Sequence, residues 1–461
     1  MRRAILAAAA LFLIVATHAL PQEVSARTAR SAPQFLSRSV IYQVWMRSFT
    51  PEGTLKAVTA RLPYIAGLGT DIVLLSPLNV HGYPSAVQGG YTTPYEIKDY
   101  ERIDPEYGTE DDLKRLVAEA HKLGLKVMMD IVYAHSANDC VLINRPGFYQ
   151  RTPDGALVIS RWRTPMPDFT NPQVQEYFRD NMLHYVRDVG IDGFRADWPS
   201  HIPLSFWEQA RDALDKVNRN VIMLSEADVP EHQLKAFDIS YNFPYYAALQ
   251  AVLLNGESAE RIRQQWEKAR DAFPRGARFL HLNDNHDRNR VDVVFGEKAA
   301  LATSVLNFTL DGIPFLYNGQ EIGDTTPPQQ QSHVAIRWEV RPGSGRPFGV
   351  RRMEFYKSLI EMRKQQPALT SGELVWVKNS NSDAVVSFVR RMGNDEILVL
   401  INTTNRPSTV AVDVQAAGYG DNRDLVKKEP VRCSPSSGRL SCVLGAWDYV
   451  VAKRNSSPAA R

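Results

Sequence analysis

The segment EDDLKRLVAEAHKLGLKVMMDIV, residues 110–132, joins a stretch of helical periodicity to a short apolar run. Its first part, residues 110–123, places apolar side chains three and four positions apart, which predicts an amphipathic helix. Its last part, residues 126–132, is a short and mainly apolar run of the kind found in buried strands. A helix followed by a buried strand is the repeating unit of parallel α/β folds, so this segment predicts that fold class.

The same unit recurs along most of the chain. Seven further strand-like runs occur at residues 40–45, 71–75, 192–197, 221–226, 236–239, 278–282 and 312–317. Segments of helical period lie between several of them, at residues 173–189, 205–217 and 297–308. Eight strands alternating with helices predict a closed (β/α)8 TIM barrel, which we expect over residues 34–366. No glycine-rich phosphate motif follows the first strand, which disfavours a dinucleotide-binding fold.

Two regions depart from this alternation. Residues 136–171, after the third strand, are polar, aromatic and irregular, and we interpret them as a short insert on the functional side of the barrel. After Pro367 the pattern changes to strand-like runs at residues 374–377, 384–389, 397–401 and 448–451, separated by turn residues. These runs predict a C-terminal antiparallel β-sandwich domain over residues 370–455.

The composition is that of an ordinary globular protein. Among 461 residues, 54 Lys and Arg balance 51 Asp and Glu, and 44% are hydrophobic. This balance argues against a disordered chain and against a protein that binds nucleic acid through a basic face. Three cysteines exclude a disulfide scaffold and a cysteine-rich zinc module. Cys433 and Cys442 flank a turn-rich loop and form the one plausible pair, whereas Cys140 is expected to be a buried thiol.

The N-terminus has the pattern of a targeting segment. Met1, Arg2 and Arg3 precede an unbroken apolar run over residues 4–16, and small residues permit cleavage after Ala19 or Ala26. We interpret residues 1–26 as a signal peptide. Because a membrane-spanning helix needs about 20 apolar residues, we expect an exported protein, periplasmic or extracellular, with no membrane anchor.

Polar residues stand at or just beyond the ends of the predicted strands, where a barrel of this kind builds its active site. They are Asp130, His135, Arg195, Asp197, Glu226, His286 and Asp287. Residues two apart in a strand point to the same side, so Arg195 is placed to bond the Asp197 carboxylate and keep it ionised. Any one such Asp often caps a helix, but their coincidence at successive strand ends indicates glycosidic chemistry. A retaining glycosidase needs a carboxylate nucleophile and a carboxylic acid about 5 Å apart.

Six motifs, in order, resemble those of glycoside hydrolase family 13, the α-amylase family, and the resemblance covers nearly all of the chain after the signal peptide. They are YEIKDY (95–100), DIVYAH (130–135), GFRADWPSH (193–201), MLSE (223–226), NHD (285–287) and GIPFLYNGQE (312–321). The resemblance implies a retaining mechanism with Asp197 as the nucleophile and Glu226 as the general acid and base. It further implies that Asp287 stabilises the transition state and that Asp130 orients Arg195.

The resemblance also implies how the sugar is held. Tyr95 would stack on the sugar being cleaved, while His135 and His286 would bind its hydroxyl groups. The third-strand motif of the family usually ends in Asn-His, and that Asn is commonly a calcium ligand, but here Ala134 takes its place. His201, whose backbone carbonyl often binds the same ion, is kept as a supporting residue. We therefore expect no required cofactor and no metal ligand among the site residues, the usual structural calcium being disfavoured by Ala134.

The implied function is hydrolysis of α-glucosidic bonds, of which α-1,4 bonds are favoured, in starch-type glucans or malto-oligosaccharides. A glucanotransferase of the same fold passes through the same covalent intermediate, and the motifs do not separate the two activities. A non-catalytic glucan-binding relative would lack the carboxylates, whereas Asp197, Glu226 and Asp287 are all in place. The short insert favours an open groove. The motifs leave the α-1,4 or α-1,6 preference, the chain length and the oligomeric state open.

Overall fold

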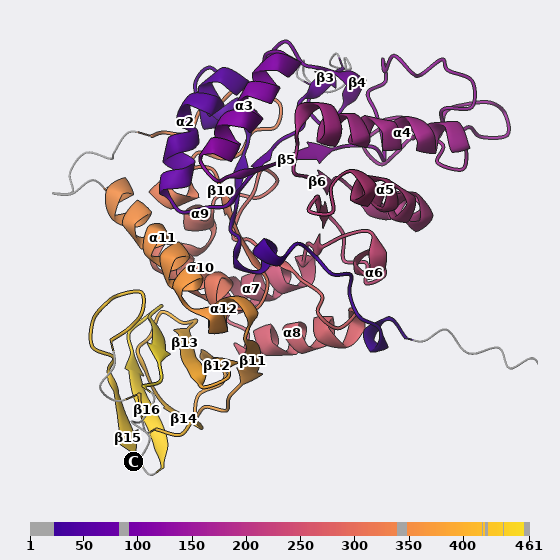
Figure 1. The fold of residues 1–461 in the computed structure, drawn as a ribbon. Helices are drawn as coiled ribbons and strands as arrows, with labels where there is room; N and C mark the ends of the chain where they lie inside the picture. The colour runs from indigo at the N-terminus through magenta and orange to yellow at the C-terminus, as the bar shows by residue number, and fades with distance from the viewer. Residues whose placement is uncertain are drawn as a thin grey trace, which may run out of the picture.

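The computed structural model describes residues 23–82, 92–338, 348–416, 418–419, 423–436 and 438–455. Its central element is a ring of parallel strands with the order β8-β7-β6-β5-β2-β1-β10-β9. These strands are β1 (Ile41–Val44), β2 (Ile72–Leu75), β5 (Lys126–Ile131), β6 (Gly193–Ala196), β7 (Ile222–Ser225), β8 (Ile239–Ser240), β9 (Leu280–His281) and β10 (Ile313–Tyr317). A parallel bridge between Ser240 and Phe279 closes the ring, so the predicted barrel is confirmed (Figure 1).

Helices cover the outside of the barrel (Figure 1). The long ones are α2 (Leu55–Gly67), α3 (Glu110–Lys122), α4 (Pro172–His184), α5 (Leu204–Val217), α7 (Phe243–Asn255), α8 (Glu260–Ala272), α10 (Glu297–Thr309) and α11 (Phe348–Gln365). The expected helix at 110–123 is α3. Its start is fixed by a capping box, in which the Thr109 hydroxyl accepts from the Asp112 N–H and the Asp112 carboxylate accepts from the Thr109 N–H.

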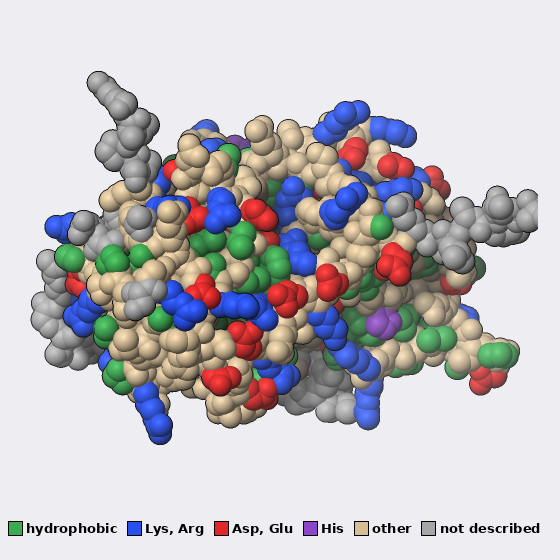
Figure 2. Space-filling model, turned by 90° about the horizontal axis from the view of Figure 1, so that it is seen from below, with side chains coloured by type: hydrophobic (Ala, Val, Ile, Leu, Met, Phe, Trp, Pro, Cys, Tyr) green, Lys and Arg blue, Asp and Glu red, His purple; other side chains and the backbone are tan. Residues whose placement is uncertain are grey.

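Shorter helices occupy the connections. They are α1 (Met46–Phe49), α6 (His232–Lys235), α9 (Val291–Phe295), α12 (Pro367–Ser371), η1 (Val24–Ala26), η2 (Gln34–Arg38), η3 (Tyr185–Val189), η4 (Pro199–His201) and η5 (Gln320–Ile322). The η3 turn extends α4 to the end of the segment predicted at 173–189, where Gly190 takes a left-handed conformation and ends it. On the face shown in Figure 2, acidic and basic side chains are interspersed.

Two additions lie on the carboxyl side of the barrel. An antiparallel hairpin of β3 (Asn79–His81) and β4 (Ile97–Ile103) follows β2. The insert at 136–171 contains turns and isolated bridges, and it joins β4 through backbone hydrogen bonds from Ala137 N–H to the Ile97 carbonyl and from Val141 N–H to the Lys98 carbonyl. A bridge between Ile159 and Pro165 then folds the tip of the insert back on itself.

The C-terminal region consists of two antiparallel sheets (Figure 1). The first contains the four predicted strands, as β11 (Glu373–Trp376), β12 (Val385–Met392), β13 (Asp395–Asn402) and β17 (Tyr449–Lys453). The second, β14 (Ser408–Val412), β16 (Arg439–Leu444) and β15 (Cys433–Ser436), was not predicted. Apolar side chains of both sheets, such as Leu398 and Val410, share one buried cluster, which makes the region a sandwich.

The cysteine predictions are confirmed. Cys433 and Cys442 face each other across β15 and β16 and form a disulfide, while Cys140 is a buried free thiol. Of the expected signal peptide, residues 1–22 lie outside the described residues. Among the helices that the structure describes, none has the length and apolar content needed to cross a membrane.

Candidate active site

The carboxyl ends of β5, β6 and β7 bring three of the expected acids together. Asp130 on β5 pairs in register with Arg195 on β6. Asp197 directly follows β6, where its N–H donates to the Ile131 carbonyl at 2.9 Å, and Glu226 directly follows β7. Because neighbouring parallel strands end at the same edge, the three carboxyl groups face the same end of the barrel.

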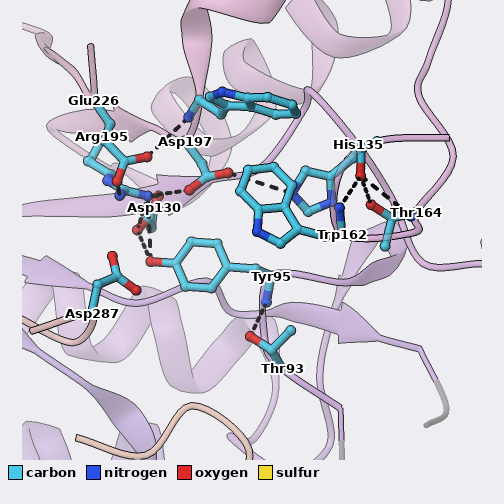
Figure 3. A network of polar contacts seen from close by, with 12 residues as sticks. Thr93, Tyr95, Asp130, His135, Trp162, Thr164, Arg195, Asp197, Glu226 and Asp287 are labelled. Carbon is cyan, nitrogen blue, oxygen red and sulfur yellow. Dashed lines mark hydrogen bonds and ion pairs between the residues drawn. The ribbon is translucent and has the colours of Figure 1, made fainter. Parts of the chain in front are cut away.

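One buried guanidinium holds these carboxyl groups in place. Nη1 of Arg195 donates to Asp130 Oδ1 and to Asp197 Oδ1, both at 2.8 Å, and Nη2 forms an ion pair with Glu226 (Figure 3). The side chains of Arg195 and Asp130 have no exposed area. Burial acts to lower the pKa of Arg195, but the surrounding carboxyl groups, Asp130 first, raise it well above its usual value, so the guanidinium stays cationic.

The pKa values of Asp197 and Glu226 are shifted in opposite directions. Burial would raise the pKa of Asp197, but its contact with His135 and the charge of Arg195 hold that pKa below its usual value. Burial, supported by the charges of Asp197 and Asp287, raises the pKa of Glu226 well above its usual value despite the opposing charge of Arg195. An ionised Asp197 therefore lies beside a protonated Glu226, which separates a nucleophile from an acid.

Asp287 is a third acid, at the rim of the pocket that these residues line. Asp287 Oδ2 lies 3.0 Å from Nε2 of His286, and Asp287 Oδ1 accepts from the side-chain amide of Gln330. Burial acts to raise the pKa of Asp287, but His286, Arg195 and Gln330 together hold it well below its usual range. This carboxylate is therefore ionised at neutral pH, and it can stabilise positive charge that develops on a bound ligand.

Tyr95 forms an aromatic floor between these acids (Figure 3). Its hydroxyl donates to Asp130 Oδ2 at 2.7 Å and lies 2.7 Å from His286 Nε2. The side-chain amide of Gln43 donates to His286 Nδ1 at 3.0 Å, so the ring proton is placed on Nε2, facing Tyr95. The rings of Tyr95 and Trp45 both stack on His286, at centroid distances of 5.3 and 5.0 Å, which fixes the orientation of the floor.

These groups surround a pocket of about 480 Å³. Its lining consists of Thr93, Tyr95, Glu96, His135, Arg161, Trp162, Asp197, Trp198, Glu226, Phe243, His286, Asp287, Gln330 and Gln331. Six of the nine site residues predicted from the sequence are in this lining. Asp130 and Arg195 lie fully buried beneath it. His201 is exposed and is not in the lining, because its ring packs on Trp198 at a centroid distance of 3.3 Å.

Several lining residues were not predicted, namely Thr93, Glu96, Arg161, Trp162, Trp198, Gln330 and Gln331. Glu96 and Trp198 stand beside Tyr95 and Asp197 inside motifs that were recognised, so their position in the chain was a usable signal. Trp198 takes a left-handed conformation, with φ of 44°, and its N–H donates to Glu226 Oε2 at 3.2 Å. Bulky residues rarely adopt this conformation, and such strain is concentrated at functional sites.

One group of possible metal ligands occurs in the described part of the chain, and it lies outside the pocket. His81, Asp104 and Glu106 hold ligand atoms within 4.8 Å of one another. Arg47 already contacts this group, with Nε donating to Glu106 at 2.9 Å and Nη2 lying 2.9 Å from His81 Nε2. A guanidinium in this place supplies the positive charge that a cation would bring, so these residues do not fit a metal site.

The comparison with protein families agrees with this geometry. The family model "Alpha amylase, catalytic domain" matches residues 24–152 and 159–341. The chain belongs to the alpha-amylase family. The match includes the barrel from β1 to β10 and every residue that lines the pocket. The resemblance inferred from the six motifs is therefore confirmed.

Individual relatives extend over more of the chain than the family model. The alpha-amylase MalA of Haloarcula japonica is 30% identical over 88% of this chain, and this chain spans 61% of the length of that relative. Neopullulanase 2 of Thermoactinomyces vulgaris is 26% identical over 91% of this chain and 78% of its own length. The crystal structure of a maltogenic alpha-amylase from Thermotoga neapolitana, 26% identical, superposes with a TM-score of 0.82 over 92% of this chain and all of that one.

Proposed function

We propose that this member of the alpha-amylase family is a retaining glycoside hydrolase that cleaves α-glucosidic bonds, chiefly α-1,4, in starch-type glucans or malto-oligosaccharides. One observation carries the proposal. A single guanidinium, that of Arg195, holds the carboxyl groups of Asp197 and Glu226 side by side, and their surroundings shift the two pKa values in opposite directions. A double displacement at a sugar carbon needs this combination of nucleophile and acid.

In the first step, an oxygen of the Asp197 carboxylate attacks the anomeric carbon of the bound glucosyl unit. The bond from that carbon to the glycosidic oxygen breaks, and Glu226 gives its proton to the departing oxygen. The Trp198 N–H bonded to Glu226 Oε2 orients this carboxyl group. Asp287, ionised at the rim, stabilises the positive charge that develops on the ring. The product of this step is a glycosyl ester of Asp197.

In the second step, the ionised Glu226 takes a proton from a water molecule, and the water oxygen attacks the anomeric carbon. The ester bond to Asp197 breaks, and both carboxyl groups return to their starting states. Two inversions give a product with the original α configuration. A sugar hydroxyl that enters in place of water gives a transfer product, so the identity of the second acceptor separates a hydrolase from a glucanotransferase.

The test is product analysis with maltoheptaose and with panose, beside an Asp197→Asn variant of nearly the same shape. Proton NMR of early products shows which anomer forms first. Shorter oligosaccharides that appear first as the α anomer, and are missing with the variant, would support the proposal. Products longer than the substrate would reassign the chain as a transferase. Cleavage of panose alone, at its α-1,6 bond, would overturn the α-1,4 preference, and no turnover of either sugar would refute the activity.

The proposal includes export and independence of cofactors. The basic start and apolar run of residues 1–16 support removal of a signal peptide within residues 1–26. The first residue of the mature protein, read by Edman sequencing or mass spectrometry, tests this assignment. A start at Met1 in protein recovered from outside the cytoplasm would refute it. Because Asp197 and Glu226 supply both the nucleophile and the acid, the chemistry needs no metal ion.

A further inference from the structure

Glu96 is a buried acid that the mechanism does not use. It lies between Tyr95 and the start of β4 and lines the active-site pocket, yet only 8% of its surface is exposed. Its backbone groups bond to Thr93 and Gly82. Within the described part of the chain, however, no hydrogen-bond donor or cation pairs with its carboxyl group, and burial raises the pKa of that group.

A carboxyl group in this position needs an explanation. Partial burial of an acid that has no protein partner costs folding free energy, because part of its hydration is lost and no protein group replaces it. Buried polar groups in proteins nearly always have a partner, so a pocket carboxyl group without a protein partner calls for a functional explanation. An unpaired carboxyl group has free acceptor positions that match the hydroxyl groups of a sugar.

An exposed aromatic ring lies on the same wall of the pocket. Trp162, at the tip of the insert, is 38% exposed, whereas the other seven tryptophans are buried or half-buried. Trp198 contacts its ring edge-on at a centroid distance of 4.4 Å, and the Arg161 guanidinium lies 4.3 Å from the ring centre. The Arg161 guanidinium lies over one face of the ring, and these contacts fix the ring at the pocket mouth while part of it stays exposed. The flat apolar face of an indole is a good partner for the C–H face of a sugar ring.

His135 links the two residues. Its ring lies 5.0 Å from that of Trp162, and it is close enough to Glu96 for their charges to interact. Figure 3 shows Trp162 and His135 beside each other, with Tyr95 next to them. The backbone bond from Ala137 to Ile97 fixes the insert against the strand that follows Glu96. The two side chains therefore belong to one rigid wall rather than to independent loops.

We propose that Glu96 and Trp162 form a binding subsite for a second sugar ring, next to the glucosyl unit that lies on Tyr95. Trp162 contacts the apolar face of this ring, and Glu96 accepts hydrogen bonds from its hydroxyl groups. The subsite rests on the proposed function and deepens it, because it makes the enzyme select glucan chains over single glucosyl units. Trp162, in the short insert, and Glu96, the residue after Tyr95, are then the residues that make this selection.

The test compares a chain with a single sugar. For the wild type and for Glu96→Gln and Trp162→Ala, kcat/KM is measured on maltotetraose and on α-glucosyl fluoride, which carries one ring. We expect each variant to lose at least about tenfold more on maltotetraose than on the fluoride, the size of a lost hydrogen bond to a charged group or of a lost aromatic contact. The control is Glu101→Gln, which removes an exposed acid from β4, the strand that follows Glu96, and should leave the ratio unchanged.

The melting temperature of Glu96→Gln is a second readout, because it should fall only if Glu96 has a structural role. Because an amide costs less to bury than an unpaired carboxylate, Glu96→Gln should melt at the same or a higher temperature while it loses chain preference. A lower melting temperature together with equal losses on both substrates would make Glu96 a structural residue and overturn the subsite. An unchanged ratio of the two kcat/KM values would also overturn it.

Failure of the proposed function would show as a wild type that hydrolyses neither substrate, which differs from the outcomes above. If the wild type hydrolyses neither substrate, calorimetric titration with maltotetraose decides the subsite alone. A Kd that rises at least about tenfold in Glu96→Gln and in Trp162→Ala would support a sugar-binding wall without catalysis. Equal affinity in all proteins, or no binding by the wild type, would refute the subsite.

Discussion

Replacing Arg195 by lysine should shift the whole pH profile of the reaction upward. The guanidinium makes three contacts with carboxyl groups from two nitrogen atoms, whereas an ammonium is a single point. A lysine placed to satisfy the buried Asp130 leaves Asp197 and Glu226 without their cation. A hydrogen bond to a charged group contributes about 1.5–3 kcal/mol. At about 1.4 kcal/mol per pKa unit, each of the two pKa values should rise by about 1–2 units.

In the Arg195→Lys variant, the acid and the alkaline limb of the pH profile should both move to higher pH. Asp197 must be ionised to attack, so a higher pKa moves the acid limb of kcat/KM to higher pH. Glu226 must be protonated to give up its proton, and because Arg195 normally lowers its pKa, the loss of that cation moves the alkaline limb to higher pH as well. The rate at the optimum should fall by at least about a hundredfold, since the nucleophile is also held less firmly.

The assay measures kcat/KM on maltoheptaose from about pH 3 to about pH 9, where both limbs of such a profile are visible. Melting curves at each pH separate unfolding from titration. Asp130→Asn is the companion variant, because it keeps the guanidinium and should shift the limbs less. Limbs that move in opposite directions, or an acid limb that stays in place, would refute the role given to Arg195.

Three further outcomes are expected. Tyr95→Phe keeps the aromatic floor but removes the hydroxyl bonded to Asp130, so the melting temperature should fall by the equivalent of about 1–3 kcal/mol while KM changes little; a large rise in KM would contradict this. Replacing Cys433 and Cys442 by serine opens a loop with a sequence separation of 9 and should destabilise the C-terminal sheets by about 2–3 kcal/mol in denaturant melts, with kcat/KM unchanged. EDTA should change neither activity nor melting temperature, because Ala134 has no side-chain oxygen to bind the calcium ion usual in the family; a metal-reversible loss would refute this.

The barrel was predictable because its strands are buried on both faces. Strands of this kind read as nearly continuous apolar runs. Seven of the eight predicted runs contain one observed strand, and the run 236–239 overlaps β8 at Ile239. The second C-terminal sheet escaped prediction for the opposite reason. Strand β15 has the sequence CSPS and is mostly exposed, and it tolerates Pro435 because it lies at the edge of its sheet. Its pairing depends on β16, which the local sequence does not reveal.

The same distinction applies to the active site. The contact between Arg195 and Asp197 follows from their spacing of two along one strand, so the sequence alone predicts it. The positions of Glu96, Trp162 and Gln330 depend on how three separate connections meet above the barrel. No periodicity encodes that meeting, because loop residues are placed by tertiary contacts. The catalytic acids are thus more predictable than the residues proposed to choose the substrate.

The number of charges in the site explains which acid carries the proton. Four carboxyl groups, those of Asp130, Asp197, Glu226 and Asp287, lie around the single buried cation of Arg195, and like charges at such distances do not all ionise near neutral pH. Three of them have hydrogen-bond donors besides that cation in the form of Tyr and His rings or a Gln amide. Besides the Arg195 cation, Glu226 accepts, within the described part of the chain, only the backbone N–H of Trp198, at 3.2 Å. The proton therefore stays on Glu226, so the same network that fixes the geometry also assigns the acid.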